Sequence, residues 1–197
     1  MIMAGTHDPL LVLLSVLIAM IASFTALSLT GRVRASTGWM QRMWLAAAAL
    51  ALGSGIWSMH FIAMLAFSMP GMTTGYDLPQ TLLSLLIALV FTGAGFAVMN
   101  WHRISHGRLA VAGLLMGLGV VTMHYVGMAA MRMAATIDYD RLWVSISALI
   151  AIGAATSALW LTSRDQLLGY RLAAAGAMGA AIAGMHYAGM RAATFTA

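Results

Sequence analysis

The chain has 197 residues, of which 62% are hydrophobic and 8% are charged, and Cys, Lys and Glu are absent from it. Soluble domains carry roughly a quarter charged residues, so we exclude a water-soluble globule and predict an integral membrane protein. The lack of Cys excludes disulfides, thiolate metal sites and thiol redox chemistry. The net charge of +5 comes from scattered Arg residues, which form no basic stripe, and we therefore expect no nucleic-acid partner.

Six apolar segments follow one another along the chain with short connections. Each is close to the ~20 residues that a spanning helix needs, and they cover residues 9–29, 43–67, 81–99, 109–131, 142–161 and 172–190. Backbone groups in lipid must be hydrogen-bonded within their own segment, so each segment is expected to be a helix. We predict a single all-α integral membrane domain over residues 1–197, with six transmembrane helices in contact with the lipid bilayer.

The Arg residues are distributed unequally between the two sides of this predicted bundle. Seven follow the first, third or fifth segment, namely Arg32, Arg34, Arg42, Arg103, Arg108, Arg164 and Arg171. The other three lie on the opposite side, together with four of the five Asp residues. Loops rich in Arg stay in the cytoplasm, so the N-terminus is predicted to lie outside the cytoplasmic membrane.

A six-residue motif, Met-His-aromatic-x-small-Met, occurs at residues 59–64, 123–128 and 185–190. Its spacing of just over sixty residues makes a pair of helices the repeating unit, which predicts three tandem repeats over approximately 9–69, 80–133 and 141–192. Small residues also recur seven and five positions before each His. We expect them to let the three motif helices pack closely around a pseudo-threefold axis along the membrane normal.

The three motif His residues lie on parallel helices, each about 6–10 Å below the predicted outer boundary. They should therefore converge, and the Met four residues after each His shares its helix face. The candidate metal ligands are His60, His124 and His186, then Met64, Met128 and Met190, and in second rank Met59, Met123 and Met185. Imidazole and thioether together favour copper, and Cu(I) in particular. The layer holds no carboxylate, which argues against magnesium, calcium and di-iron sites.

Other interpretations of the motif remain open. A buried His can serve as an interhelical hydrogen-bonding group and Met as packing, and for a single motif we would prefer that view. Three motifs in register favour a functional site, since polar groups within a bilayer are costly. His and Met are also axial ligands of haem, so a haem sensor is an alternative. Cu(I) transport is another, whereas no constellation in one membrane layer favours an enzyme.

At this motif the sequence resembles the MHYT family of bacterial integral-membrane sensor modules. Residues 123–125 and 185–187 read Met-His-Tyr, as in the family motif, whereas Phe61 replaces Tyr in the first copy. The Thr of the family motif is replaced in all three copies, by Ile62, Val126 and Ala188. The resemblance covers essentially the whole chain.

The resemblance implies a sensor in the bacterial inner membrane that detects O₂, CO or NO through copper bound by the motif His and Met residues. It also implies seven helices and a cytoplasmic signalling domain, such as a GGDEF, EAL, LytTR or histidine kinase domain. Only six spans can be counted, so the seventh helix and the output domain are expected to be absent from this chain. The chain itself is then not an enzyme, and it could form a homodimer.

Several residues outside the motif are weaker candidates for the site. His102 and His106 are four apart, but we expect them to contact lipid headgroups in a cytoplasmic turn rather than a metal. His7 is expected in an unordered N-terminal segment, and Trp57 could border the site or simply pack. The outer carboxylates are expected to be solvated, or to orient a ligand imidazole; they are Asp77, Asp138 and Asp140.

Overall fold

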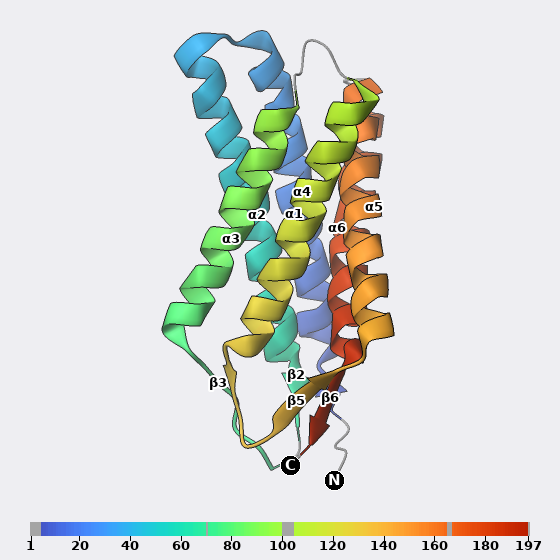
Figure 1. The fold of residues 1–197 in the computed structure, drawn as a ribbon. Helices are drawn as coiled ribbons and strands as arrows, with labels where there is room; N and C mark the ends of the chain where they lie inside the picture. Colours follow the sequence, from blue (N-terminus) through green and yellow to red (C-terminus); the bar gives the residue numbers. More distant parts are fainter. Residues whose placement is uncertain (1–4, 70, 100–104, 165–166, 197) are drawn as a thin grey trace.

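The computed structural model describes residues 5–69, 71–99, 105–164 and 167–196, without the side chains of 162–164. Its main body is a bundle of long helices in which consecutive helices run antiparallel (Figure 1). The helices are α1 (Pro9–Ala35), α2 (Gly38–Ala66), α3 (Leu78–Val98), α4 (His106–Ala129), α5 (Arg141–Arg164) and α6 (Leu168–Ala192). The predicted all-α fold with six helices is confirmed.

The helices form a closed ring in chain order, with three of them on the inside. Each helix packs on its neighbours in sequence, α1 closes the ring against α6, and α2, α4 and α6 also contact one another. In the most apolar 18-residue stretch, 56% of α2 and 50% of α4 is buried, against 28% in each of α1, α3 and α5. The three motif helices are therefore parallel and more buried than the outer three, although each keeps an exposed apolar face, as Leu50, Leu114 and Leu172 show.

The surface of the bundle is suited to lipid. Large apolar side chains are exposed along the outer helices, among them Leu10, Leu82 and Leu149. Five helices, α1 to α5, are long and apolar enough to cross a membrane. Helix α6 is long enough but less hydrophobic, because more than half of its residues are Ala or Gly. Small residues of this kind suit a helix packed between others. The chain is a multi-pass membrane protein.

A short antiparallel strand pair closes each pair of helices at the same end of the bundle, here called the strand end (Figure 1). β1 (Thr6–His7) pairs with β2 (Phe67–Ser68), β3 (Gly75–Tyr76) with β4 (Met131–Arg132), and β5 (Thr136–Tyr139) with β6 (Ala193–Thr196). Both termini of the chain lie at this end. These strands of two to four residues were not predicted, and they delimit structural repeats over 6–68, 75–132 and 136–196.

Three Asp residues occupy equivalent positions at the start of the outer helices. Asp8, Asp77 and Asp140 each cap a helix, and their side-chain oxygens accept hydrogen bonds of 2.7–3.4 Å from backbone N–H groups of the first turn. Asp77 also accepts a hydrogen bond of 2.8 Å from Arg132, which lowers the pKa of this carboxyl group. Asp140 and Asp138 are exposed and Asp77 is partly exposed, so all three are accessible to solvent, and the capping role of Asp77 and Asp140 was not predicted.

The small residues before each motif His have a different role from the one predicted. A Cβ atom added at the position seven before each His would lie 2.5–3.0 Å from a Cα atom of α3, α5 or α1. These contacts join each inner helix to the outer helix of the next repeat, and the positions are Gly53, Gly117 and Gly179. Gly55 and Gly119 instead face the outer helix of their own repeat. The small residues thus seat each inner helix between two outer ones.

Candidate metal centre

The three motif His side chains meet at the centre of the bundle. His60 on α2, His124 on α4 and His186 on α6 are fully buried, and their ring centroids are 5.0–5.1 Å apart in all three pairs. The Nδ1 atom of His60 lies 3.1 Å from that of His186 and 3.2 Å from that of His124. In the part of the chain that the structure describes, no other group of three His, Cys, Asp or Glu residues could hold a metal ion.

The arrangement of these nitrogens suits a cation. Nδ1 of His60 faces Nδ1 of both other rings. In a neutral imidazole this atom carries either one N–H or one lone pair, so at most one of the two contacts is an ordinary two-centre hydrogen bond. A metal ion bound to two imidazoles at about 2.0 Å in tetrahedral geometry holds their nitrogens about 3.3 Å apart. The observed separations of 3.1 and 3.2 Å are close to this value, so the residues present fit a metal bound by imidazole.

The outer nitrogens of two of the rings pack against another motif. Nε2 of all three His residues is buried without a hydrogen-bond partner among the described residues. A Cβ atom added at Gly127 would overlap the ring of His60, and one added at Gly189 would overlap the ring of His124. Ala63 occupies the equivalent position in the first motif. Glycine three positions after the His is therefore required by the ring of another motif in the second and third copies.

The two sets of motif Met residues lie on different sides of the His layer. Those four positions after each His belong to a buried cluster at the strand end, and they are Met64, Met128 and Met190. Those directly before each His are fully buried in the main core of the bundle, and they are Met59, Met123 and Met185. The role of either set in binding a metal stays a prediction.

The helix face that carries each His is apolar on the side away from the strand end. The residues four and eight positions before each His share its face by helical periodicity. All are buried in the main core, and they are Ile56, Val120 and Ile182, then Leu52, Met116 and Met178. Two apolar layers therefore lie below the His layer, on the side of the α1–α2 connection.

A series of two aromatic or imidazole rings extends from each His ring towards the strand end. The aromatic residue after each His packs edge-on against it at 4.8–5.1 Å, and these are Phe61, Tyr125 and Tyr187. Each of these rings in turn contacts, at 5.3–5.8 Å, the residue before a capping Asp, namely Tyr76, Tyr139 and His7. The capped outer helices thus help to hold the buried imidazoles in position.

The outermost ring of each series lies in a strand. His7 is part of β1, where it packs against Phe67 and Tyr187, so the expectation of an unordered segment there was wrong. Burial lowers the pKa of the His7 imidazole. Burial, with a smaller contribution from Tyr125, raises the pKa of Tyr139 to about 12. Both groups are therefore neutral near pH 7, which suits their packing against other rings.

A buried Ser on each outer helix faces one of the motif aromatics. Ser15, Ser84 and Ser147 are equivalent, fully buried, and donate at 2.7 Å to the carbonyl oxygen three residues earlier. Because Ser147 donates there, the hydroxyl of Tyr125 donates to Ser147 over their 3.0 Å contact. Tyr187 faces Ser15 in the same way, although its hydroxyl lies outside hydrogen-bonding geometry.

The first repeat makes this contact with a different residue. Phe61 has no hydroxyl group, and Nε1 of Trp57 instead donates to Ser84 at 3.1 Å, while the Trp57 and Phe61 rings lie 4.9 Å apart. Trp57 thus takes the place of the missing tyrosine hydroxyl, a role that the sequence did not reveal. Of the other two candidate His residues, His106 is exposed at the start of α4, at the end of the bundle opposite the strands, and His102 lies outside the described residues.

Comparison with known proteins places the chain in a family. The family model MHYT, described as a bacterial signalling protein N terminal repeat, matches residues 1–41, 53–112 and 117–175. The chain belongs to the MHYT family. No solved structure matches it.

Several MHYT relatives are much longer signalling proteins. The chain is 45% identical, over 97% of its length, to MucR of Pseudomonas aeruginosa, a bifunctional diguanylate cyclase/cyclic di-GMP phosphodiesterase. It is 43% identical over 95% of its length to NbdA, a cyclic di-GMP phosphodiesterase of the same organism, and 32% identical over 96% to the signaling protein YkoW of Bacillus subtilis. The chain spans 28%, 24% and 24% of these proteins, respectively.

These matches define what kind of module the chain is. It corresponds to the MHYT sensor region of bacterial signalling proteins, and the catalytic domains of MucR and NbdA lie outside the matched part. The family assignment made from the motif is confirmed, and so is the prediction that the chain itself is not an enzyme.

Substitution Gly127→Ala should destabilise the protein, because the new methyl group overlaps the ring of His60. We expect a loss of about 1–3 kcal/mol, typical of overpacking, measured by thermal unfolding in detergent. Gly153→Ala is the matched control, since nothing lies within 4 Å of an added Cβ there. It should be neutral, or stabilising by up to ~1 kcal/mol. Equal effects of the two substitutions would contradict the packing of His60 against Gly127.

The Trp57 and Phe61 positions should be energetically coupled. Phe61→Tyr adds a hydroxyl whose acceptor, Ser84, is already bonded to Trp57, and Trp57→Val leaves Ser84 without that donor. Each single variant should therefore lose stability, and the double variant, which has the residue pattern of the second repeat, should recover part of it. A double-mutant cycle should give a coupling energy of about 1 kcal/mol. Strict additivity would show that the two positions are independent.

Proposed function

We propose that this domain is a membrane sensor that binds copper at the His triad and reports a diatomic gas (O₂, CO or NO) or the redox state to a cytoplasmic output. The observation that carries the proposal is the convergence of three fully buried imidazole nitrogens at 3.1 and 3.2 Å. The relatives support the second half, because their names describe signalling proteins, including enzymes of cyclic di-GMP turnover.

The chemistry of the donor set favours copper. The three Nδ1 atoms are neutral donors of intermediate softness, and the nearest layer towards the strand end supplies the thioethers of Met64, Met128 and Met190. The capping carboxylates of the outer helices are already bonded to backbone N–H groups. Copper would contribute an exchangeable coordination position for a gas and an accessible change of oxidation state.

The packing around the triad provides a means of transmission. His60 lies against Gly127 of α4, and His124 lies against Gly189 of α6, so a shift of either ring moves the backbone of the next inner helix. The inner helices continue from this layer to the opposite end of the bundle. A change in ligation would thus alter the relative positions of α2, α4 and α6 where they reach the other membrane face.

Two alternatives receive less support. A haem between two axial ligands needs a flat cavity, whereas the three rings of the triad contact one another and are fully buried. Cu(I) transport needs ligands through the thickness of the membrane, whereas the layer directly below the His residues is wholly aliphatic, with Ile56, Val120 and Ile182. Thioethers return only in the following layer, at Met116 and Met178.

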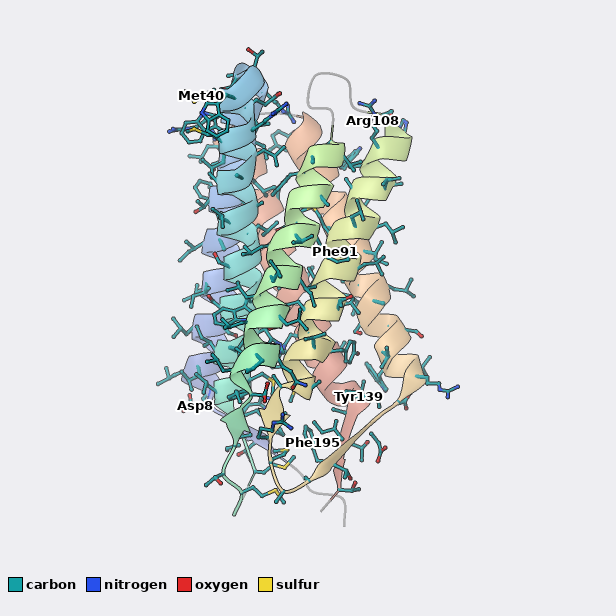
Figure 2. The ribbon with its side chains drawn as sticks, turned by 60° about the vertical axis from the view of Figure 1, so that its left-hand side comes forward. Asp8, Met40, Phe91, Arg108, Tyr139 and Phe195 are labelled. Atoms are coloured by element: carbon teal, nitrogen blue, oxygen red, sulfur yellow. The ribbon has the colours of Figure 1, made fainter. Side chains whose placement is uncertain are left out.

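We also propose that the strand end faces outwards. Arg32 and Arg34 lie in the last turn of α1, and Arg42, Arg108 and Arg171 lie in the first turns of inner helices, all at the end opposite the strands. Figure 2 shows that end at Met40 and Arg108, and the strand end at Asp8, Tyr139 and Phe195. The positive-inside rule then puts the Arg-rich end in the cytoplasm and the triad near the outer face.

Copper binding can be measured on the purified protein in lipid nanodiscs. After incubation with Cu(I) and removal of excess metal, the wild type should retain copper, and His60→Ala should lower its affinity by more than about tenfold. His106→Ala, an exposed His at the other end, is the control and should change nothing. Met128→Leu preserves side-chain volume and tests the thioether without removing a His. No retained copper in the wild type, or equal retention in His60→Ala, would refute the proposal, and an intense Soret band would indicate haem instead.

The orientation can be tested because the chain has no Cys, so an introduced thiol is unique. Thr6→Cys places a thiol at the strand end and Thr37→Cys places one between α1 and α2, both at exposed positions. In intact spheroplasts, a membrane-impermeant maleimide should label Thr6→Cys, whereas Thr37→Cys should react only after permeabilisation. The reverse pattern would show that the strand end faces the cytoplasm.

A further inference from the structure

The cluster above the His triad is unusually rich in methionine. Five of its seven buried residues are Met and the other two are Phe, whereas Met accounts for six of the 24 buried residues in the main core. Two more Met residues pack against the cluster from outside. Three of these seven belong to the motif, and the other four, here called the methionine cap, are Met69, Met72, Met131 and Met133.

The backbone explains how the cap is placed over the triad. Each inner helix leads directly into a strand, and the residues seven and nine positions after the His, two apart, lie on one face of that extended segment. In the second repeat these are Met131 and Met133, which continue from the motif residue Met128. In the first repeat Met69 occupies the later position, and a turn returns the chain beside it, with the N–H of Met72 donating to the Met69 carbonyl at 3.2 Å. Gly71 has a φ of 77°, which permits this turn.

The cap reaches from the surface of the strand end to the buried motif Met residues. Met72 and Met133 are partly exposed at that surface. Met69 and Met131 are 5% and 7% exposed, and of the motif residues Met64 and Met128 are 2% and 0% exposed and Met190 is 8% exposed. Methionine side chains of one packed cluster therefore connect the solvent-facing surface with the layer next to the imidazoles. Figure 2 shows sulfur atoms gathered between the helix ends and the strands.

We propose that the methionine cap binds Cu(I) and passes it to the His triad. A thioether is a neutral, soft ligand that selects Cu(I) over the harder divalent ions. Transfer would proceed by ligand exchange, one sulfur replacing another, with copper remaining in the +1 state, so no electron donor is required. Delivery of Cu(I) to the His triad rests on the proposed copper site, whereas binding of Cu(I) by the cap does not. Met also fills irregular gaps in cores. If the cap residues only packed, Leu would serve equally well in their place.

The first experiment uses the unmodified protein and Ag(I), a redox-inert substitute for Cu(I). Hydrogen peroxide oxidises thioethers to sulfoxides, and a sulfur bound to metal is protected. Mass spectrometry of peptides should show that Ag(I) slows oxidation of Met72 and Met133 by about tenfold. Met40 and Met43 are the internal controls, because they are 49% and 42% exposed at the opposite end of the bundle. Equal oxidation of both pairs with and without Ag(I) would overturn the proposal.

The second experiment measures delivery. The cap variant, M69L/M72L/M131L/M133L, removes the thioethers of the cap and keeps the motif. The control variant, M40L/M43L/M116L/M178L, replaces four Met residues outside the cap and the motif with Leu. Transfer of Cu(I) from a coloured chelator to the cap variant should be about tenfold slower, with the final copper content unchanged. The control variant should match the wild type. Equal rates in all three proteins would overturn delivery through the cap.

The two proposals fail in different ways. If the triad does not hold copper, the wild type retains none after removal of excess metal, but Ag(I) still protects the cap. If the cap only packs, Ag(I) gives no protection although the triad binds copper. Thermal unfolding of the cap variant separates slow delivery from misfolding, and the Ag(I) experiment needs no substitution at all.

Discussion

The close contact of three imidazoles on the axis of the bundle is the constraint on which the rest of the structure depends. Three polar rings are fully buried within a segment that spans lipid, where an unsatisfied polar group is costly. Nδ1 of His60 can come within 3.2 Å of the other two Nδ1 atoms only if the inner helices approach closely, which requires Gly127 and Gly189 beside the rings. Their orientation in turn depends on the edge-on aromatic rings that follow each His.

The supporting structure repeats around the axis, but the first repeat differs from the others in a correlated way. Phe61 replaces Tyr, Trp57 supplies the donor to Ser84, and Ala63 stands where the other motifs have Gly. The three imidazoles are therefore not equivalent. His60 has an aromatic neighbour without a hydroxyl group, whereas the neighbour of His124 is hydrogen-bonded to Ser147.

Much of this architecture could be predicted from the sequence, because its strongest signals are long and repeated. Apolar segments of about twenty residues predict spanning helices, and three His residues in register predict their convergence. The strands could not be predicted, since pairs such as Thr6–His7 with Phe67–Ser68 are too short to show a pattern and depend on contacts between distant segments. The same applies to Asp77 and Asp140, which resemble loop charges until the helix start that they cap is located.

The glycines before the motif show a different limit of sequence analysis. Periodicity indicates that Gly53, Gly117 and Gly179 allow close helix packing, but it does not indicate which helix they contact. The structure shows that they contact the outer helices, and the space next to the rings of His60 and His124 is provided by Gly127 and Gly189. Spacing along one helix fixes which residues share a face, whereas the partner depends on the rotation of that helix within the bundle.

The bundle is chemically asymmetric along its axis. On the strand side, the His layer is covered by thioethers and aromatic rings. On the other side, Ile56, Val120 and Ile182 form an aliphatic layer at the start of the main core. In the proposed copper site, the nearest soft ligands would therefore lie on the strand side of the metal. A change in ligation would reach the opposite end of the bundle as a movement of the packed inner helices, because these helices are continuous through the core.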